Sequence, residues 1–451
     1  MPMDALKQYI DLYTANAGVI DSHSAPVMNE LRQAACTLLK SSRFPTRKDE
    51  GFHKTSINDM FAPDFGVNIS RVNIPVDVAE SFRCDIPNVS TLLSLVVNDR
   101  FVATRSLLNN LPEGITVTSL ASAASQNPEL IRKYYGSIAP ADNVNVALNN
   151  MLAQDGVFIH IRKGVVLEKP LQLVNIFAGP APLAAFRRLL IVAEENSKCD
   201  ILVCDHTQNR DVDYLSSEII EVSLADGASV GLYGIEESSA KTARYSQMFV
   251  RQESNSSFSS ASATLLNGVT RNDFSVTLHG QNAETNLAGI IIADGKSHID
   301  NNSNVIHDAP HCRSNQLFKY LLDGESSGAF EGSIVVNPDA PFTEGYQSNH
   351  NILASDNARM HTRPQLLIFN DEVKCSHGAT TGQLDRDALF YMQTRGIPED
   401  QARRLLMQAF MADAIDTIRV EAIRDRLRHL VERRLTGEDA LCAECGSECH
   451  K

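Results

Sequence analysis

Cys375 and His377 are the residues of this chain whose types and spacing most directly suggest chemistry. They lie two positions apart, and side chains at positions i and i+2 of an extended strand point to the same face. A sulfur and an imidazole nitrogen on one face suit zinc, iron or an iron–sulfur cluster. The alternative is structural: Cys375 would be a small buried hydrophobe at the end of a strand, and His377 would hydrogen-bond a turn.

A second candidate metal site is formed by the last residues of the chain. Cys442, Cys445, Cys449 and His450 follow a C-x2-C-x3-C-H pattern and supply four soft ligands within nine residues. Three thiolates and one imidazole could close a tetrahedral zinc site or hold a cluster. The alternative is that this short, acidic tail is disordered and binds no metal.

Other segments that resemble functional motifs favour structural roles. His311 and Cys312 are adjacent, so in a strand they would face opposite sides and could not share a metal without a bulge. The segment from Gly289 to Ser297 has five residues before Gly-Lys-Ser, whereas a phosphate-binding loop has four, and no helical pattern follows it. We therefore expect no ATPase activity in this chain.

Composition excludes several classes of protein. The 451 residues are 43% hydrophobic and 21% charged, which is typical of a globular chain with two or three domains. A formal net charge of −14 argues against a nucleic-acid partner. No apolar run is long enough to span a membrane, and the N-terminus has no signal-peptide pattern. Nine cysteines without a disulfide framework indicate reduced thiols and a cytoplasmic location.

The pattern of apolar and polar residues divides the sequence into four regions. Residues 1–150 are predicted to be mainly helical, and residues 151–378 consist of short alternating strands separated by Asp-Gly and Asn turns. Residues 379–436 are again helical, and residues 437–451 form the cysteine-rich tail, for which disorder is the alternative given above. A strand region this long needs a barrel, a sandwich or a solenoid to manage its edges. No fixed repeat period decides between them.

The C-terminal helical region has clear boundary signals. Asp385 is a good N-cap, Gly396 ends the first helix, and Pro398 can occupy the first turn of the next one. That second helix is predicted to be amphipathic over residues 399–434. Its basic side chains could meet an acidic partner or could form a solvated face; they are Arg403, Arg404, Arg424, Arg426 and Arg428.

Several segments together resemble the SufD scaffold subunits of the SufB/SufD family, which act in iron–sulfur cluster assembly. The most specific is KCSHGATTGQLDRDALFYMQTRGI at 374–397. The same likeness extends over SNQLFKYLL at 314–322, GAFEGSIVV at 328–336, YQSNHNILASDNARM at 346–360 and RPQLLIF at 363–369. DGVFIHIRKGVVLEKPLQL at 155–173 and PTRKDE at 45–50 also resemble the family, although Phe52 stands where a tryptophan is usual.

The resemblance implies a mainly β fold, with a central right-handed parallel β-helix flanked by N-terminal and C-terminal helical regions. It implies a scaffold without turnover that pairs with a SufB-like paralogous scaffold or, in isolation, with itself as a homodimer. An iron–sulfur cluster would form transiently at the shared interface, near His377 and Cys375. Because a cluster takes about four protein ligands, the partner would supply the rest. A SufC-like ABC-type ATPase would dock on the C-terminal helices. No residue pattern indicates a flavin site.

Two other functions stay open at this stage. A β-helix carbohydrate-active enzyme would need clustered acids in one groove, and Asp300, Asp308 and Glu331 show no matching spacing. A metal-binding protein could instead act through zinc at Cys442, Cys445, Cys449 and His450. Truncation at Leu441 separates this last possibility from the scaffold, because a scaffold would still bind its partners.

Overall fold

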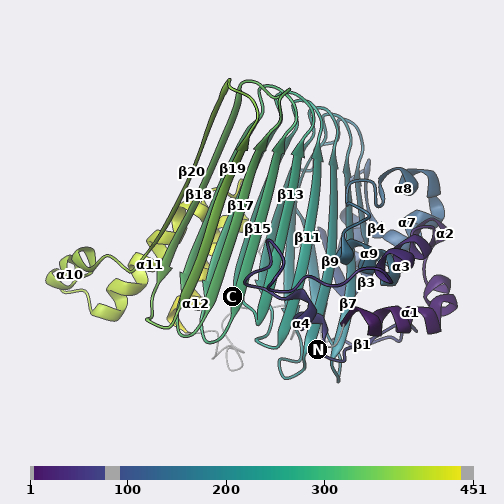
Figure 1. The fold of residues 1–451 in the computed structure, drawn as a ribbon, viewed down its shortest axis with the longest axis horizontal. Coiled ribbons are helices and arrows are strands. Elements are labelled where there is room, and N and C mark those ends of the chain that lie inside the picture. Colours follow the sequence, from purple (N-terminus) through teal and green to yellow (C-terminus); the bar gives the residue numbers. More distant parts are fainter. Residues whose placement is uncertain (1–4, 77–91, 438–451) are drawn as a thin grey trace.

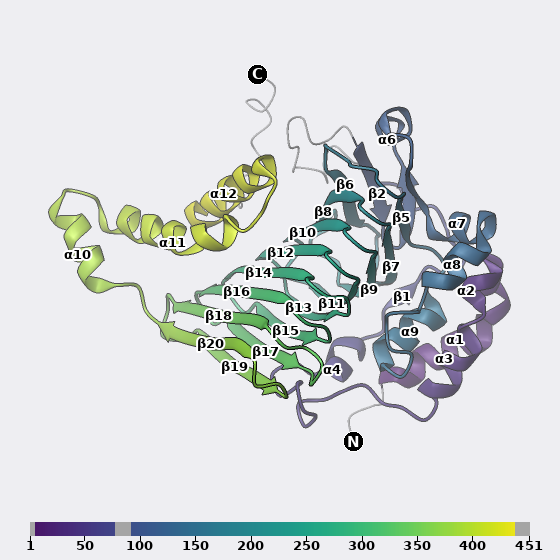
Figure 2. The same cartoon turned by 90° about the horizontal axis from the view of Figure 1, so that it is seen from above.

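Two parallel sheets wound into a solenoid form the centre of the molecule (Figure 1). The computed structural model describes residues 5–76 and 92–437, and the statements below concern these residues. Helices precede and follow the solenoid and cover different faces of it (Figure 2). The expected parallel β-helix with flanking helical regions is confirmed.

Each turn of the solenoid contributes one strand to each sheet. The first sheet contains β5 (Val157–Ile161), β7 (Leu183–Ala193), β9 (Tyr214–Leu224), β11 (Thr242–Gln252), β13 (Val269–Leu278), β15 (His298–His307), β17 (Ser327–Val336) and β19 (Arg359–Ile368). The second contains β6 (Leu171–Phe177), β8 (Lys198–Thr207), β10 (Ser229–Glu237), β12 (Ser257–Leu266), β14 (Glu284–Ala293), β16 (Arg313–Leu322), β18 (Thr343–Leu353) and β20 (Val373–Gly382).

Strands from the region expected to be mainly helical complete the other end of both sheets. β4 (Ile115–Ser119) pairs antiparallel with β5, and β1 (Gly66–Val67) pairs with β7. In the second sheet, β2 (Leu93–Val97) joins β6, and β3 (Arg100–Ala103) pairs antiparallel with β2. This end of the solenoid is therefore covered by its own chain.

The turns differ in length, which hides the repeat from a search for a fixed period. Paired residues lie 26 positions apart between Ala243 and Val269 and 32 positions apart between Ser327 and Arg359. One corner nevertheless repeats the same geometry, because one residue per turn has φ between 55° and 68° and donates its N–H to the next turn. These residues are Asn196, Gly227, Asn255, Asn282, His311 and Phe342. Glycine and asparagine adopt this left-handed conformation most readily.

Apolar side chains from both sheets fill the space between them. The core runs from Ile159 and Ile191 near the N-terminal end to Phe318 and Phe330 near the C-terminal end. Alternate residues of each strand point inwards, so a side chain's direction follows from its position in the strand. This rule fixes which residues of the last strands face the interior.

Helices of the N-terminal region pack on one another and on the first sheet, and one of them contacts the second sheet instead. They are α1 (Ala5–Ser22), α2 (Pro26–Asn29), α3 (Arg32–Leu39), α4 (Ile57–Phe61), α6 (Arg105–Asn110), α7 (Leu120–Gln126), α8 (Pro128–Tyr134) and α9 (Val144–Leu152). A fully buried ion pair joins Arg188 on β7 to Glu221 on β9, at 2.5 Å. Glu221 also accepts backbone N–H groups of Gly136, Ile138 and Ala139, and thereby fixes the loop after α8.

A segment between α3 and α4 lies across the first sheet. Arg271 on β13 is completely buried; it donates to the Gly51 carbonyl at 2.8 Å and stacks on the Phe52 ring at 4.1 Å. The same guanidinium pairs with Asp300 on β15, at 2.7 Å, and Thr55 donates to that carboxylate. Two turns of the solenoid and the N-terminal region are thus joined by one polar cluster.

Three helices follow the last strand: α10 (Arg386–Thr394), α11 (Glu399–Ile415) and α12 (Glu421–Thr436). The predictions for both ends of the first helix are correct, since the Asp385 side chain accepts from two N–H groups and Gly396 has φ 87°. Pro398 is the N-cap of α11 and lies just before its first turn. The prediction of one amphipathic helix over 399–434 is wrong. The chain turns between Asp416 and Val420, so α11 and α12 both pack apolar residues on the outer face of the second sheet.

Candidate functional site

Both sheets stop at the C-terminal end of the solenoid, where no further strand among the described residues covers them. β19 is the last strand of one sheet and β20 is the last of the other. We call these two strands, residues 359–382, the open end. Large apolar side chains are exposed beside it: Phe342, Tyr346, Leu367, Ile368 and Phe369. Unpaired strand edges and exposed apolar residues together are typical of a surface that another chain covers.

The backbone of β19 offers an interrupted row of hydrogen-bonding groups at this edge. Arg359 and Phe369 donate their N–H groups inwards to the turn before, so odd-numbered residues of β19 bond to β17. The even-numbered residues therefore face the open edge. Pro364 is one of them and has no N–H, which is the position where a strand tolerates proline.

In β20 the alternation places the backbone of both candidate residues at the edge. The Glu372 carbonyl accepts the N–H of Phe342, so even-numbered residues of this segment bond to the preceding strand. Cys375 and His377 are odd-numbered, and their N–H and C=O groups face outwards. A partner strand would meet the backbone and the side chains of these two residues at once.

Cys375 is half-buried and packs against apolar side chains of both sheets. It pairs with Gly345 on β18 and packs against the small buried cluster of Ile334, Val336 and Ala340. Burial raises the pKa of the Cys375 thiol above its ordinary value, and a backbone hydrogen bond at Gly345 opposes the shift. The thiol is therefore mainly protonated near neutral pH and must lose its proton to bind a metal.

His377 is exposed and pairs with Gln347 on β18. Because Gln347 is 2% exposed and points into the solenoid, His377 occupies the next interior position, which is uncovered only because the sheet ends there. In the structure, the side chains of Cys375 and His377 lie on the same face of β20, as the sequence predicts. Among residues 5–76 and 92–437, no group of three or more His, Cys, Asp or Glu residues is arranged to hold a metal. Strand β20 thus offers two soft ligands, Cys375 and His377.

Comparison with known proteins assigns the chain to a family. The pattern of the SufBD core domain of the SUF system for iron–sulfur cluster assembly matches residues 176–410, and that of the SufBD N-terminal region matches residues 3–173. The chain belongs to the SufBD family. The core match covers the solenoid from β6 onwards and reaches into α11.

Relatives within the SufBD family cover nearly the whole chain. An iron–sulfur cluster assembly SufBD family protein of Synechocystis is 29% identical over 89% of this chain and 90% of its own length. The iron–sulfur cluster assembly protein SufD of Escherichia coli is 25% identical over 96% of this chain and 97% of its own. The protein of the same name in Bacillus subtilis is 25% identical over 78% and 81%. These similarities support a role in cluster assembly.

The other candidate ligands of this SufBD chain divide into residues that the structure describes and residues that it does not. Cys442, Cys445, Cys449 and His450 lie outside the described residues. The Cys312 thiol is buried and donates to the Gly280 carbonyl, at 3.2 Å. His311 is a left-handed corner residue whose ring stacks on Phe342 at 4.8 Å. These last two residues have structural roles, as their spacing indicates.

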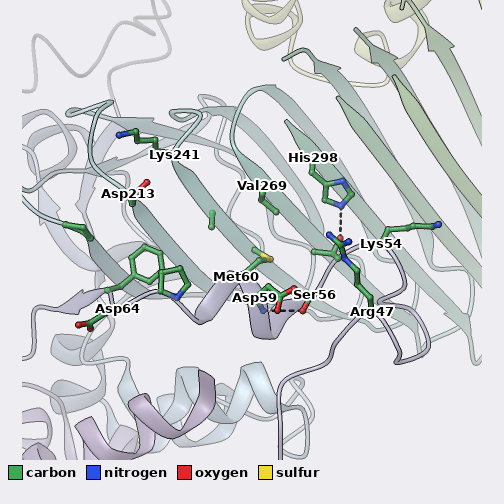
Figure 3. A pocket seen from close by; sticks show the side chains of 15 residues that line it. Arg47, Lys54, Ser56, Asp59, Met60, Asp64, Asp213, Lys241, Val269 and His298 are labelled. Carbon is green, nitrogen blue, oxygen red and sulfur yellow. Dashed lines mark hydrogen bonds between the residues drawn. The ribbon is translucent and has the colours of Figure 1, made fainter. Parts of the chain in front are cut away.

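A cavity of about 600 Å³ lies far from Cys375, between the N-terminal segment and the first sheet (Figure 3). Its lining mixes basic and acidic side chains, including Arg47, Lys241 and Asp213. His298 also lines it, but Nε2 is bonded to Thr55 Oγ1 at 2.8 Å and Nδ1 to Ser327 Oγ at 2.7 Å. The soft ligand types in this lining are the Met60 thioether and the His298 imidazole, and both nitrogens of that imidazole are already hydrogen-bonded.

Helix α10, whose ends the sequence predicts, exposes aromatic side chains that the sequence interpretation did not single out. It buries none of its side chains and extends away from the solenoid beyond β20 (Figure 2). Phe390 and Tyr391 are 67% and 58% exposed. The aromatic pair in a short, capped helix was a visible signal, but its exposure depends on the helix leaving the body of the protein.

The arginines predicted to form a basic face are partly used within the chain. Arg428 pairs with Asp416 at 2.5 Å and with Asp425 at 2.8 Å, and Arg403 donates to the Ala354 carbonyl.

Among the residues that the structure describes, no helix is long and apolar enough to cross a membrane.

Proposed function

We propose that this SufBD chain is a scaffold subunit that contributes half of a site for building or transferring iron–sulfur clusters. The observation that carries the proposal is the open end, where both sheets stop and where Cys375 and His377 occupy the last strand. A paralogous SufB-like scaffold covers this end by adding strands to its edges. In its absence, a second copy of the chain takes the same place as a homodimer.

The nascent cluster is cargo in this account and is held only while the two scaffolds are joined. Cys375 and His377 supply one sulfur and one nitrogen, and the partner supplies the remaining ligands of about four. Covering the open end excludes water from a half-buried thiol. Iron then replaces the thiol proton, so that binding releases a proton. The chain carries out no turnover of its own.

The C-terminal helices receive an ABC-type ATPase. Exposed aromatic residues are enriched at protein interfaces, and Phe390 and Tyr391 on α10 are held away from the rest of the chain. α11 follows α10 and packs against β14 and β16. A displacement of α10 upon ATP hydrolysis can therefore be transmitted to the sheet that ends in β20.

The assembly is tested by anaerobic purification of the tagged chain from the cytosol of its native cell, where the account places it. Co-purifying proteins are identified by mass, and iron, sulfide and zinc are assayed in the eluate. The account predicts stoichiometric recovery of a paralogous scaffold and an ABC-type ATPase. Recovery of the chain alone, with its zinc, would contradict it.

Truncation after Leu441 separates the scaffold from a metal-binding tail. The scaffold account predicts that the truncated chain binds the same partners in the same ratio. If the truncated chain loses all bound metal, and neither the full chain nor the truncated chain binds a partner, the metal-binding tail is favoured instead.

Of the acids considered for a carbohydrate-active site, Asp300 is buried against Arg271, and Glu331 pairs with Arg363, so both serve the fold.

A further inference from the structure

A line of polar side chains runs inside the solenoid towards its open end. Ser303 on β15 donates its hydroxyl to Gln316 Oε1 on β16, at 2.6 Å. Gln347 on β18 donates its amide to the same oxygen, at 3.2 Å. Gln316 pairs with Gln347, and Gln347 pairs with His377. The line thus ends at one of the two candidate ligands.

Gln347 is held so that its amide oxygen is available to the next residue of the line. Its Nε2 is engaged with Gln316 in the turn before, and an amide carries its oxygen on the other side from its nitrogen. Gln347 Oε1 is buried and makes no hydrogen bond with any described residue. A Cβ at Gly332 would lie 2.2 Å from Gln347 Nε2, so the absence of a side chain there gives the amide its room.

We propose that Gln347 is a positioning residue for His377. Its amide oxygen accepts the N–H of one imidazole nitrogen and leaves the lone pair of the other nitrogen directed to the open end. Three arguments support this. A buried acceptor without a donor is costly. Paired residues of neighbouring strands are about 4.8 Å apart, within reach of a rotated ring. A ligating histidine almost always donates its other N–H to an acceptor.

The imidazole is free to adopt this orientation. In the described part of the chain no hydrogen bond involves His377, and the residue is exposed. This inference deepens the proposed function. Its consequence, that His377 is oriented to bind iron, rests on that proposed function. The hydrogen bond itself needs no metal, so it can be tested in the chain alone.

The test uses the full chain with 15N-labelled histidine, prepared without iron. Long-range 1H–15N spectra report the tautomer of each ring, and the His377 signals are those lost in His377→Gln. The proposal predicts one dominant tautomer for His377. Gln347→Met, which keeps the side-chain length but removes the amide, should give shifts averaged over both tautomers. Gln347→Glu retains an acceptor and should restore the single tautomer.

Asn349→Leu is the matched control. Asn349 lies two residues further along β18, is equally buried, and pairs with Ala379, which does not titrate. This variant should leave the His377 signals unchanged. An averaged tautomer in the wild-type chain, or the same change in Gln347→Met and Asn349→Leu, would overturn the proposal.

Iron binding in the assembled complex provides the second readout. Gln347→Met should weaken iron retention against a chelator about 10-fold or more, as expected for loss of a group that orients a ligand. Wild-type retention in a Gln347→Met complex would overturn the positioning role even if the hydrogen bond exists. If the wild-type complex binds no iron, the proposed function fails, whereas the spectra still decide the hydrogen bond.

Discussion

Gly345 and Cys375 occupy paired positions on β18 and β20, and a Cβ at Gly345 would lie 3.3 Å from Cys375 Sγ. The same Cβ would lie 3.2 Å from the Ile334 side chain, which is buried. Both distances are tighter than ordinary van der Waals contact. The strand on the inner side of Cys375 thus fits closely against the thiol, whereas the outer side has no covering strand.

The first prediction is that Gly345→Ala makes Cys375 more reactive. Since Ile334 cannot move outwards, the thiol side chain must yield towards the open edge, with a stability loss of about 1–3 kcal/mol for overpacking. Alkylation of Cys375 by iodoacetamide, followed by peptide mass mapping, should be faster than in the wild-type chain. Gly378→Ala is the control, because a Cβ at Gly378 meets nothing within 4 Å. An equal effect of both variants would contradict the close fit.

In the wild-type chain, alkylation of Cys375 should be slower at pH 7 than that of the same peptide unfolded. Burial raises the pKa of this thiol, so less thiolate is present at that pH. The rate should rise at a higher pH than for the peptide. Equal pH profiles would show that Cys375 is not protected by the fold.

The second prediction separates the edge of β20 from its inner side. Ala379 directs its N–H to the open edge, so Ala379→Pro should weaken binding of a partner strand. It should change the stability of the chain little, because β19 already accommodates Pro364 at an edge-facing position. Gly378 directs its N–H to β18, so Gly378→Pro should destabilise the chain by about 1–3 kcal/mol through an unpaired carbonyl. Binding is measured by co-purification and stability by chemical denaturation. The reverse pattern would place the partner elsewhere.

The third prediction concerns a buried histidine in the solenoid. Burial lowers the pKa of His307 to about 4, from an ordinary value of 6.5, and Nε2 is bonded to Ser314 Oγ at 2.8 Å. Between these values the unfolded chain binds a proton that the folded chain does not, so stability falls as pH decreases. The shift corresponds to about 3 kcal/mol lost between pH 6.5 and 4.

His307→Leu supplies the comparison, because other groups also titrate in this range. The stability difference between the wild-type chain and this variant should change by about 3 kcal/mol over the interval and stay constant above pH 7. Chemical denaturation at a series of pH values gives the difference. A difference independent of pH would mean that His307 is solvated.

The strands, the caps of α10 and the shared face of Cys375 and His377 could be predicted from the sequence. Strand alternation and helix capping are local properties, so the residues nearby are enough to indicate them. The sequence did not reveal the number of turns, since the spacing between paired residues varies and the corner position accepts Gly227, Asn255 and even Phe342. The break between α11 and α12 also escaped prediction. No proline or glycine marks it; tertiary contacts do, including Arg419 bonded to Ser229 and Ser257.

The location of the candidate site at an open edge could not be predicted from residue types. Whether Cys375 is in an inner strand or in the last one depends on where the chain leaves the sheet, which is a property of the whole fold. Gln347 was likewise not recognisable, because a glutamine in a strand has no special spacing. Its importance in our account comes from its pairing with His377.

The fourth prediction is that Phe390→Ser with Tyr391→Ser abolishes binding of the ABC-type ATPase but leaves the free energy of unfolding within about 0.5 kcal/mol. α10 buries none of its side chains, and the contact of Tyr391 with Arg395 is local and exposed, so little of the stability depends on these rings. Binding is measured by co-purification of the three proteins. Gln393→Ala, an exposed residue of the same helix, is the control. Retained binding would move the docking surface to α11 or α12.

If the open end provides part of the ligand set of a cluster, as we propose, bound iron and sulfide must depend on Cys375 and His377. The most direct test is the iron and sulfide content of the complex with the paralogous scaffold and the ATPase, purified without oxygen. The complex is compared with Cys375→Ala, His377→Ala and both together. We predict that the variants assemble normally and lose most of their iron and sulfide, the double variant most of all. Assembled complexes with full iron and sulfide in the double variant would contradict the claim.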